Sequence, residues 1–293
     1  MPCVSAAAML QDAQKGRYAV AQINISNLES IRTLVNAAQE AKAPLILGVS
    51  MGAAGQLGGY RTIADVVGSI LDFDHIRVPV CLHADHSAYD AALAALHAGF
   101  TSVMFDGSRL PIGENLRLTG ELAALCHARG VSLEAEVGAV AGHEDGGAAD
   151  GELADPDECA RMAATGVDML AAGIGNMHGV YPPDWKGLNF PLLETIRRAV
   201  GHVPLVLHGG SGIAADDIRR VIGMGVCKIN VNAECRAAFA RATRRFILDE
   251  QDMADTGNMQ LITMQPGLAA VRQVSMDKLR LFGCIGKAGG DKA

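Results

Sequence analysis

One phrase recurs along this 293-residue sequence: a helical segment ends, a glycine follows, and a short apolar strand begins. The phrase is found in AALHAGFTSVMFDG, LCHARGVSLEAEVG, MAATGVDMLAAGIG and VIGMGVCKINVN. Each central glycine (Gly99, Gly130, Gly166 and Gly225) is predicted to end a helix in the left-handed conformation, which only glycine adopts without steric cost. Almost continuously apolar strands are typical of a parallel sheet covered by helices. The sequence therefore predicts alternating strands and helices.

Eight such strands are expected between Tyr18 and Asn232. They begin near Tyr18, Pro44, Pro79, Thr101, Val131, Val167, Pro204 and Val226. Helical patterns separate them, one being NLESIRTLVNAAQEA with Asn27 as its N-cap. Eight units predict a (β/α)8 TIM barrel forming a single domain over residues 1–293. The competing fold, a doubly wound open sheet, is disfavoured because no GxGxxG follows the first strand.

Two long glycine-rich loops, residues 139–156 and 174–190, follow strands, and loops on that side of a barrel carry function. After Phe239 come basic helical residues and a polar loop over residues 252–258. A last helix, LAAVRQVSMDKLRLFG, is expected to pack outside the barrel.

Composition excludes several functional classes. The net charge of -7, with no cluster of Lys and Arg, argues against nucleic-acid binding, and no apolar run reaches the length of a membrane span. The apolar N-terminal stretch lacks the basic residues of a signal peptide. Seven scattered cysteines without a CxxC pair favour a reducing, cytoplasmic location, with most thiols in the core.

Polar residues gather where the predicted strands end. The carboxyl ends of barrel strands meet at one mouth, so His86, His178 and His208 are expected to converge there. Three imidazoles with an open fourth position are the ligand set of a catalytic zinc ion. His83 alternates with Asp85 along its strand, so it either orients that carboxylate or binds metal. The remaining helical or outer-loop histidines are expected at the surface: His75, His97, His127 and His202.

The segment HGGSG, from His208 to Gly212, follows the seventh strand and precedes a helix. Glycines let backbone N–H groups approach an anion, and a helix start adds a partial positive charge. This position therefore favours a phosphate site over a plain turn.

These motifs, together with INISNLE, LHADHSAYDAA, GIGNMHGVY and VCKINVNAECR, resemble the zinc-dependent class II fructose-bisphosphate/tagatose-bisphosphate aldolase family over roughly residues 24–286. The resemblance implies a lyase of carbohydrate metabolism, acting in glycolysis. It would cleave a ketose 1,6-bisphosphate or ketose 1-phosphate reversibly into dihydroxyacetone phosphate and an aldehyde. It also implies Zn²⁺, with room for a monovalent cation, and a homodimer or homotetramer.

The resemblance also assigns roles to residues of this sequence. It implies that His86, His178 and His208 hold zinc, that Asp85 is the catalytic carboxylate, and that Glu144 moves protons from a mobile loop. It places an alternative metal position near Asp106 and Glu136. The implied substrate and phosphate contacts are Asn24, Ser50, Gly179, Gly209, Gly210, Ser211, Asn230, Val231, Asn232 and Ala233.

Four departures from the family pattern bear on the substrate. Ser87 replaces a usual glycine, Ala233 a usual threonine, and Pro182 a usual lysine for which Lys186 is a candidate substitute. The segment ADTGNMQLITMQPG lacks the arginine that usually reaches the second phosphate. The aldehyde half and the fructose or tagatose stereochemistry therefore stay open. A zinc-dependent hydrolase or isomerase of a sugar phosphate on the same barrel, and an inactive sugar-phosphate binder, are the alternatives.

Overall fold

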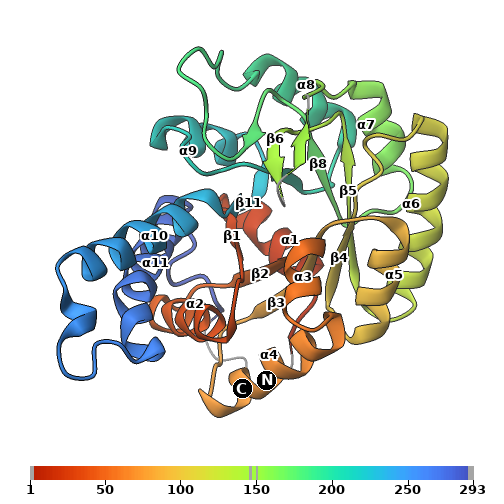
Figure 1. Cartoon of the computed structure of the whole chain (residues 1–293). Helices are drawn as coiled ribbons and strands as arrows, with labels where there is room; N and C mark the ends of the chain where they lie inside the picture. The colour runs from red at the N-terminus through yellow and green to blue at the C-terminus, as the bar shows by residue number, and fades with distance from the viewer. Residues whose placement is uncertain (1–2, 145–146, 150, 290–293) are drawn as a thin grey trace.

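The structure, a computed structural model, describes residues 3–144, 147–149 and 151–289, and its centre is a closed barrel of eight parallel strands (Figure 1). Around the barrel the order is β1, β11, β10, β8, β5, β4, β3, β2. Their bounds are β1 Val20–Asn24, β2 Leu45–Ser50, β3 Val80–Ser87, β4 Ser102–Phe105, β5 Ser132–Val137, β8 Met169–Ala172, β10 Leu205–Leu207 and β11 Val226–Val231. The predicted TIM barrel is confirmed, and the open sheet is excluded because β1 pairs with β11.

Amphipathic helices cover the outside of the barrel and bury their apolar faces against the strands. They are α2 Leu28–Ala41, α4 Tyr60–Phe73, α5 Tyr89–Ala98, α6 Ile112–His127, α7 Pro156–Ala163, α8 Phe190–Val200, α9 Ala215–Gly223 and α10 Ala233–Leu248, with a short α3 Met51–Gln56 after β2. Asn27 caps α2 as predicted, in a reciprocal capping box with Ser30. Gly99 ends α5 at a φ of 99°, which confirms the left-handed helix stop there.

The N-terminal segment forms a helix that the sequence pattern did not suggest, α1 Ala6–Gly16. Ser5 caps it, and its apolar face, including Leu10, is buried. The Ala6 N–H donates to Ser132 Oγ at 3.1 Å, and the Val4 N–H donates to the Val80 carbonyl oxygen at 2.8 Å. Both acceptors begin strands, so this segment closes the amino end of the barrel, opposite the mouth.

The two long loops at the mouth contain strands where only loops were expected. β6 Ala141–Glu144, β7 Gly147–Ala149 and β9 Met177–His178 form a small sheet in the order β7, β6, β9. Gly142 pairs with His178, and a side chain at Gly142 would collide with the His178 backbone. These strands are too short and glycine-rich to show a strand periodicity, yet they fix the loop that carries His178.

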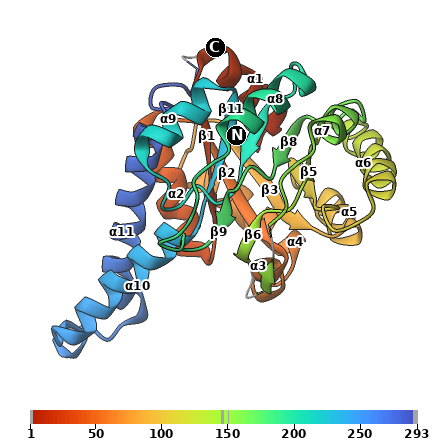
Figure 2. The same ribbon diagram turned by 90° about the horizontal axis from the view of Figure 1, so that it is seen from above.

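The chain ends in a long helix, α11 Gln260–Leu281, which packs against α10 and α2 outside the barrel. Figure 2 shows α10 and α11 projecting together from the barrel, joined through the short 3₁₀ helix η1 Gln251–Met253. The expected outer position is confirmed, but α11 begins earlier than predicted and includes Pro266. Among the helices of the described ranges, none combines the length and apolarity needed to span a bilayer.

Candidate metal centre

Strand β3 delivers Asp85 and His86 to the mouth through an irregularity in its pairing. Ser50 and Asp85 are register partners between β2 and β3, whereas the register with β4 shifts between Ala84 and Ser87. His86 has a φ of 43°, a left-handed conformation that costs a non-glycine residue on the order of 1–2 kcal/mol. In a regular strand, neighbouring side chains point to opposite faces. The irregularity therefore lets the adjacent residues Asp85 and His86 both point toward the mouth of the barrel.

The three predicted histidines meet above the barrel. His86 comes from β3, His178 from β9, and His208 directly follows β10. Their ring centroids are 4.8 Å apart for His86 and His178, 4.5 Å for His86 and His208, and 5.7 Å for His178 and His208. One nitrogen from each ring lies within 4.8 Å of those from the other two. The geometry thus offers three nitrogen ligands to one point.

The hydrogen bonds of the His86 and His208 rings indicate which ring nitrogens are available as metal ligands. His86 Nδ1 donates to Asp106 Oδ2 and His208 Nε2 donates to Glu134 Oε1, both at 2.8 Å. Because ionised carboxylates only accept, these nitrogens carry protons, and in the neutral form of each ring the other nitrogen is a lone-pair acceptor. His86 Nε2 and His208 Nδ1 face each other at 2.6 Å. Two lone pairs in that position need a cation, so the residues present fit a divalent metal.

Burial keeps two of the imidazoles, those of His178 and His208, neutral, as metal ligands must be. Desolvation, reinforced by the neighbouring rings, lowers the pKa of His178 to about 3. Desolvation also lowers the pKa of His208, against the opposing influence of Glu134. Two of the three ligands are therefore unprotonated at neutral pH.

Asp85 lies beside the histidines as a buried carboxylate. Asn24 Nδ2 donates to its Oδ2 at 3.1 Å, and Asn230 Nδ2 donates to its Oδ1 at 3.3 Å. Burial works against its charge, but the electrostatic influence of His86 and Lys228 outweighs burial and holds the pKa of Asp85 well below its usual range. The group is ionised and positioned, and it can accept a proton.

A second group of possible ligands adjoins the first. Ligand atoms of His86, Asp106 and Glu136 lie within 4.8 Å of one another. Burial, with the charge of Asp106, raises the pKa of Glu136 to about 8. Asp106 keeps a pKa below its usual range despite burial, because His86 and Ser108 donate hydrogen bonds to it. This arrangement places one protonated and one ionised carboxyl group next to the metal ligands.

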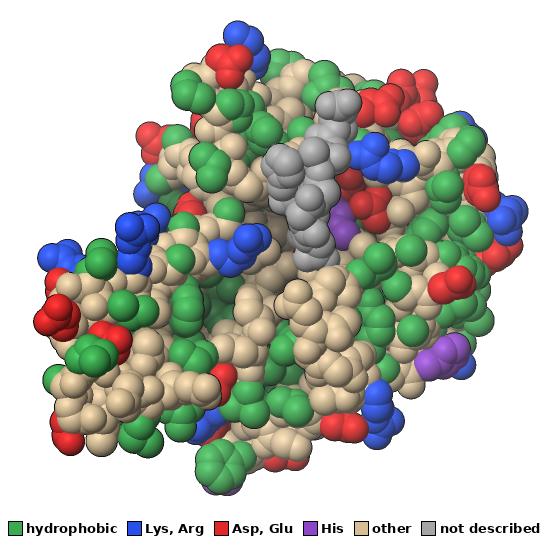
Figure 3. All heavy atoms as spheres, in the orientation of Figure 1, with side chains coloured by type: hydrophobic (Ala, Val, Ile, Leu, Met, Phe, Trp, Pro, Cys, Tyr) green, Lys and Arg blue, Asp and Glu red, His purple; other side chains and the backbone are tan. Residues whose placement is uncertain are grey.

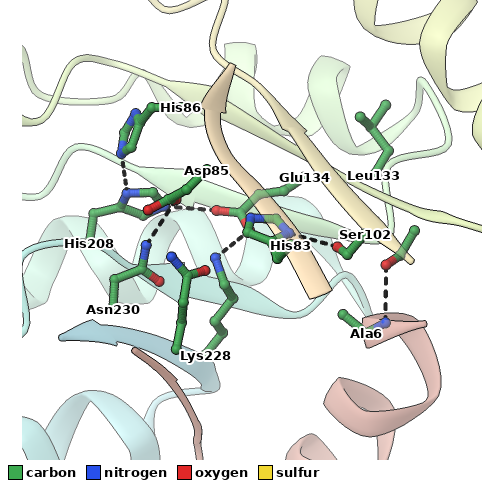
Figure 4. A network of polar contacts seen from close by, with 12 residues as sticks. Ala6, His83, Asp85, His86, Ser102, Leu133, Glu134, His208, Lys228 and Asn230 are labelled. Carbon is green, nitrogen blue, oxygen red and sulfur yellow. Dashed lines mark hydrogen bonds and ion pairs between the residues drawn. The ribbon is translucent and has the colours of Figure 1, made fainter. Parts of the chain in front are cut away.

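A closed polar network lies beneath the histidines, as Figure 4 shows. Glu134 accepts from His208 with one oxygen and from Lys228 Nζ with the other, at 2.6 Å. His83 bonds Ser102 Oγ through Nδ1 at 2.8 Å, and its Nε2 lies 3.5 Å from Glu134 Oε2. His83 thus contacts Glu134 rather than orienting Asp85, and the metal-ligand groups of the described residues do not include it. Lys228 was missed, although a lone lysine inside an apolar strand was a visible signal.

A pocket beside the metal ligands collects most of the predicted phosphate contacts. Its lining is Asn24, Asp85, His178, Gly179, Gly209, Ser211, Asn230, Asn232, Ala233 and Arg236. Gly209 has a φ of 67°, and a side chain there would collide with the Met177 carbonyl oxygen. The Tyr181 hydroxyl group donates a hydrogen bond to the Gly209 carbonyl oxygen at 2.9 Å, which stabilises this close approach of the two backbone segments. Arg236 was missed by the sequence reasoning.

Three of the predicted contacts lie outside this lining. The Gly210 N–H donates to the Asn230 carbonyl, Val231 is buried in β11, and Ser50 Oγ accepts from the Ala53 N–H to cap α3. Lys186 is exposed and does not line the pocket. Glu144 ends β6, and its side chain lies outside the described part of the structure.

Comparison with known proteins gives a consistent result. Residues 4–287 match the sequence model of the family described as "Fructose-bisphosphate aldolase class-II". The fructose-bisphosphate aldolase of Mycoplasma genitalium is 47% identical over 245 residues, which cover 84% of this chain and 85% of that protein. That of Streptococcus pneumoniae serotype 4 is 43% identical over 293 residues, covering 98% of this chain and 100% of that protein. The crystal structure of the YdjI aldolase from Escherichia coli K12 superposes with a TM-score of 0.80 at 32% identity, covering 98% of this chain and 100% of that one.

Proposed function

The chain belongs to the class II fructose-bisphosphate aldolase family, and on that premise we propose that it cleaves a ketose 1,6-bisphosphate or ketose 1-phosphate into dihydroxyacetone phosphate and an aldehyde. The observation that carries the proposal is an ionised Asp85, held by two amide groups, beside three histidines that each bring one ring nitrogen within 4.8 Å of the other two. Base and Lewis acid must flank the same carbon–carbon bond, and this arrangement supplies the base and the residues that would hold the Lewis acid.

The metal would be held by His86, His178 and His208. Imidazole nitrogens are ligands that suit zinc. When bound, zinc supplies the Lewis acidity that offsets negative charge developing on the substrate oxygens. Asp106 and Glu134 fix the ring orientation and tautomer of two ligands from the far side. Glu136 and Asp106 would form the alternative metal position beside His86.

Asp85 would act as the general base in the cleavage direction. It takes the proton of the C4 hydroxyl, C4 becomes the aldehyde carbon, and the C3–C4 bond breaks with its electron pair left on C3 as an enediolate. A proton delivered to C3 then completes dihydroxyacetone phosphate, and Glu144 is the proposed donor. In the synthetic direction Asp85 returns its proton to the aldehyde oxygen, as microscopic reversibility requires.

The pocket next to Asp85 would bind the phosphate of the dihydroxyacetone half. Gly179, Gly209 and Ser211 bring backbone groups to it, and Asn230 and Asn232 line it from the β11 side. The N-terminus of α10 adds a partial positive charge. Residues 254–267 contain no arginine for a second phosphate, so the aldehyde half need not be phosphorylated.

The test is chelator-sensitive release of dihydroxyacetone phosphate, measured by a coupled assay on fructose 1,6-bisphosphate, tagatose 1,6-bisphosphate and their 1-phosphates. We expect activity on at least one substrate, loss after chelation, and recovery with Zn²⁺. Release of inorganic phosphate in place of dihydroxyacetone phosphate would support a hydrolase. Full activity of metal-stripped protein would contradict the proposal.

We further infer that residues 1–293 work as one domain and that the family relationship extends to a homodimer or homotetramer. Sedimentation equilibrium of the purified protein measures the second point directly.

A further inference from the structure

We infer that Arg236, the last residue of the VCKINVNAECR motif and one to which the resemblance assigns no role, binds the substrate phosphate and sets the preference for phosphorylated substrates. The inference rests on the proposed function. Arg236 lines the same pocket as Gly209 and Ser211, and among the described lining residues it is the single Lys or Arg side chain. The remaining ionised lining group is Asp85, whose negative charge repels an anion.

The helix geometry directs Arg236 at the pocket. Asn232 is the N-cap of α10, and Arg236 follows it by four residues and Ala233 by three. Residues at these spacings share a helix face, and helical side chains lean toward the helix N-terminus. A long side chain at this position therefore covers the turn that faces the phosphate loop. Figure 3 shows basic side chains along the α10 border of the hollow on this face.

The charge of Arg236 is available to a ligand. Helical arginines elsewhere pair with carboxylates on their own helix, as Arg117 does with Glu121 at 2.7 Å and Arg198 with Glu194 at 3.0 Å. Within the part of the chain that the structure describes, no carboxylate pairs with Arg236. It is an exposed cation at the rim of the pocket.

The acidic residue on the same turn is already occupied. Glu234 Oε1 accepts from the Gly212 N–H at 2.6 Å and from Lys278 Nζ at 2.8 Å. Lys278, which is mostly buried on α11, thereby neutralises the carboxylate that shapes the end of the phosphate loop. Glu234 therefore holds the loop without drawing Arg236 away or repelling the phosphate.

A formal positive charge strengthens phosphate binding in this pocket beyond what backbone N–H groups and the N-terminus of α10 supply. The sequence offers proline at 182 and alanine at 233, which supply no side-chain donor, and Lys186 is not part of the lining. An arginine fork donates two parallel hydrogen bonds to a phosphate, an arrangement that a hydroxyl group cannot satisfy equally well. Arg236 therefore accounts for both affinity and discrimination.

The experiment compares Arg236→Gln with Arg241→Gln in the zinc-loaded enzyme. Arg241 is an exposed arginine on the same helix and does not line the pocket, so its substitution controls for the lost charge. We measure the inhibition constant of inorganic phosphate, and KM and kcat for the ketose phosphate. R236Q is expected to weaken phosphate binding and raise KM by about ten- to a hundred-fold, with a much smaller change in kcat. R236K should retain part of the affinity because it keeps the charge without the fork.

Equal phosphate affinity in R236Q and R241Q, whether high or absent, overturns the inference. Zinc content and thermal melts of each variant exclude misfolding as the cause of a difference. The proposed function can fail separately. If the wild-type protein binds phosphate through Arg236 but releases no dihydroxyacetone phosphate, phosphate binding by Arg236 is supported and the aldolase activity is contradicted.

Discussion

Glu134 and Glu136 lie two residues apart on β5 and are both buried, yet their pKa values move in opposite directions. Burial raises the pKa of both, but Lys228 and His208 reverse the effect at Glu134 and bring its pKa to about 2. Glu136 has Asp106 beside it instead, and its pKa rises to about 8. The strand presents the same residue type twice, and the neighbours from other strands decide which carboxyl group is charged.

The two carboxyl groups belong to two layers of the barrel interior. A buried layer, His83, Ser102, Glu134 and Lys228, pairs its charges internally and is closed to solvent. The mouth layer above it, Asp85 with the three metal-binding candidates, leaves nitrogen lone pairs facing one another. The hydrogen bond from His208 Nε2 to Glu134 Oε1 ties the mouth layer to the buried layer and holds the His208 ring in place.

The largest effect is expected from breaking the mouth layer alone. Asp85→Asn keeps the shape and removes the base, so kcat should fall by about 10²–10⁴-fold while zinc content stays unchanged. The exposed Asp90→Asn, on α5, serves as the control for losing one carboxylate. Steady-state kinetics and metal analysis measure the two quantities. An Asp85→Asn enzyme with wild-type kcat would remove Asp85 from the mechanism.

Disrupting the buried layer should lower the free energy of unfolding. Lys228→Met leaves Glu134 buried without its cation, which should lower the free energy of unfolding by about 3–5 kcal/mol in urea titrations. Combining it with Glu134→Gln removes the uncompensated charge, so the double variant should regain most of that loss. If the double variant is as unstable as Lys228→Met, the pair is not the source of the effect.

The buried layer also predicts an acid sensitivity. Desolvation, with the charge of Lys228, lowers the pKa of His83 to about 3, while Glu134 and Asp85 oppose the shift and His208 adds to it. The unfolded chain binds a proton at His83 near pH 6.5, so between pH 6.5 and 3 it binds more protons there than the folded protein. Stability is therefore lost as the pH falls, by about 2 kcal/mol between pH 7 and 5 from this group.

His83→Gln should remove that part of the pH dependence from the unfolding free energy of the metal-free protein. The exposed His202→Gln should leave the wild-type slope intact. Urea titrations at pH 7, 6 and 5 measure both slopes. Identical slopes for wild type and His83→Gln would show that His83 titrates equally in both states.

The sequence predicts the mouth layer better than the buried layer. The apolar strands and glycine stops predict the barrel, and the barrel predicts that His86, His178 and His208 share one mouth, because parallel strand ends converge. The partners of Lys228 could not be predicted, because β5 and β11 are far apart in sequence and are not neighbours in the barrel. The small sheet of β6, β7 and β9 was missed because its strands are two to four residues long. Arg236 was missed because the phosphate contacts that the resemblance implies end at Ala233, and a helical arginine carries no sequence signal of the side to which it points.

The smallest effect should come from adding one donor to the mouth. Ala233 is the first residue of α10 and lines the phosphate pocket, so Ala233→Thr would place a hydroxyl group there. A net hydrogen bond contributes about 0.5–1.5 kcal/mol, which predicts a two- to tenfold lower inhibition constant for inorganic phosphate. Ala233→Val has nearly the same shape without the hydroxyl group, and it should leave the constant unchanged or raise it. Because the buried layer is untouched, the free energy of unfolding should change by less than about 1 kcal/mol in both variants. Equal inhibition constants for Ala233→Thr and Ala233→Val would mean that the hydroxyl group does not reach the anion, and that Arg236 and the backbone groups complete the site without it.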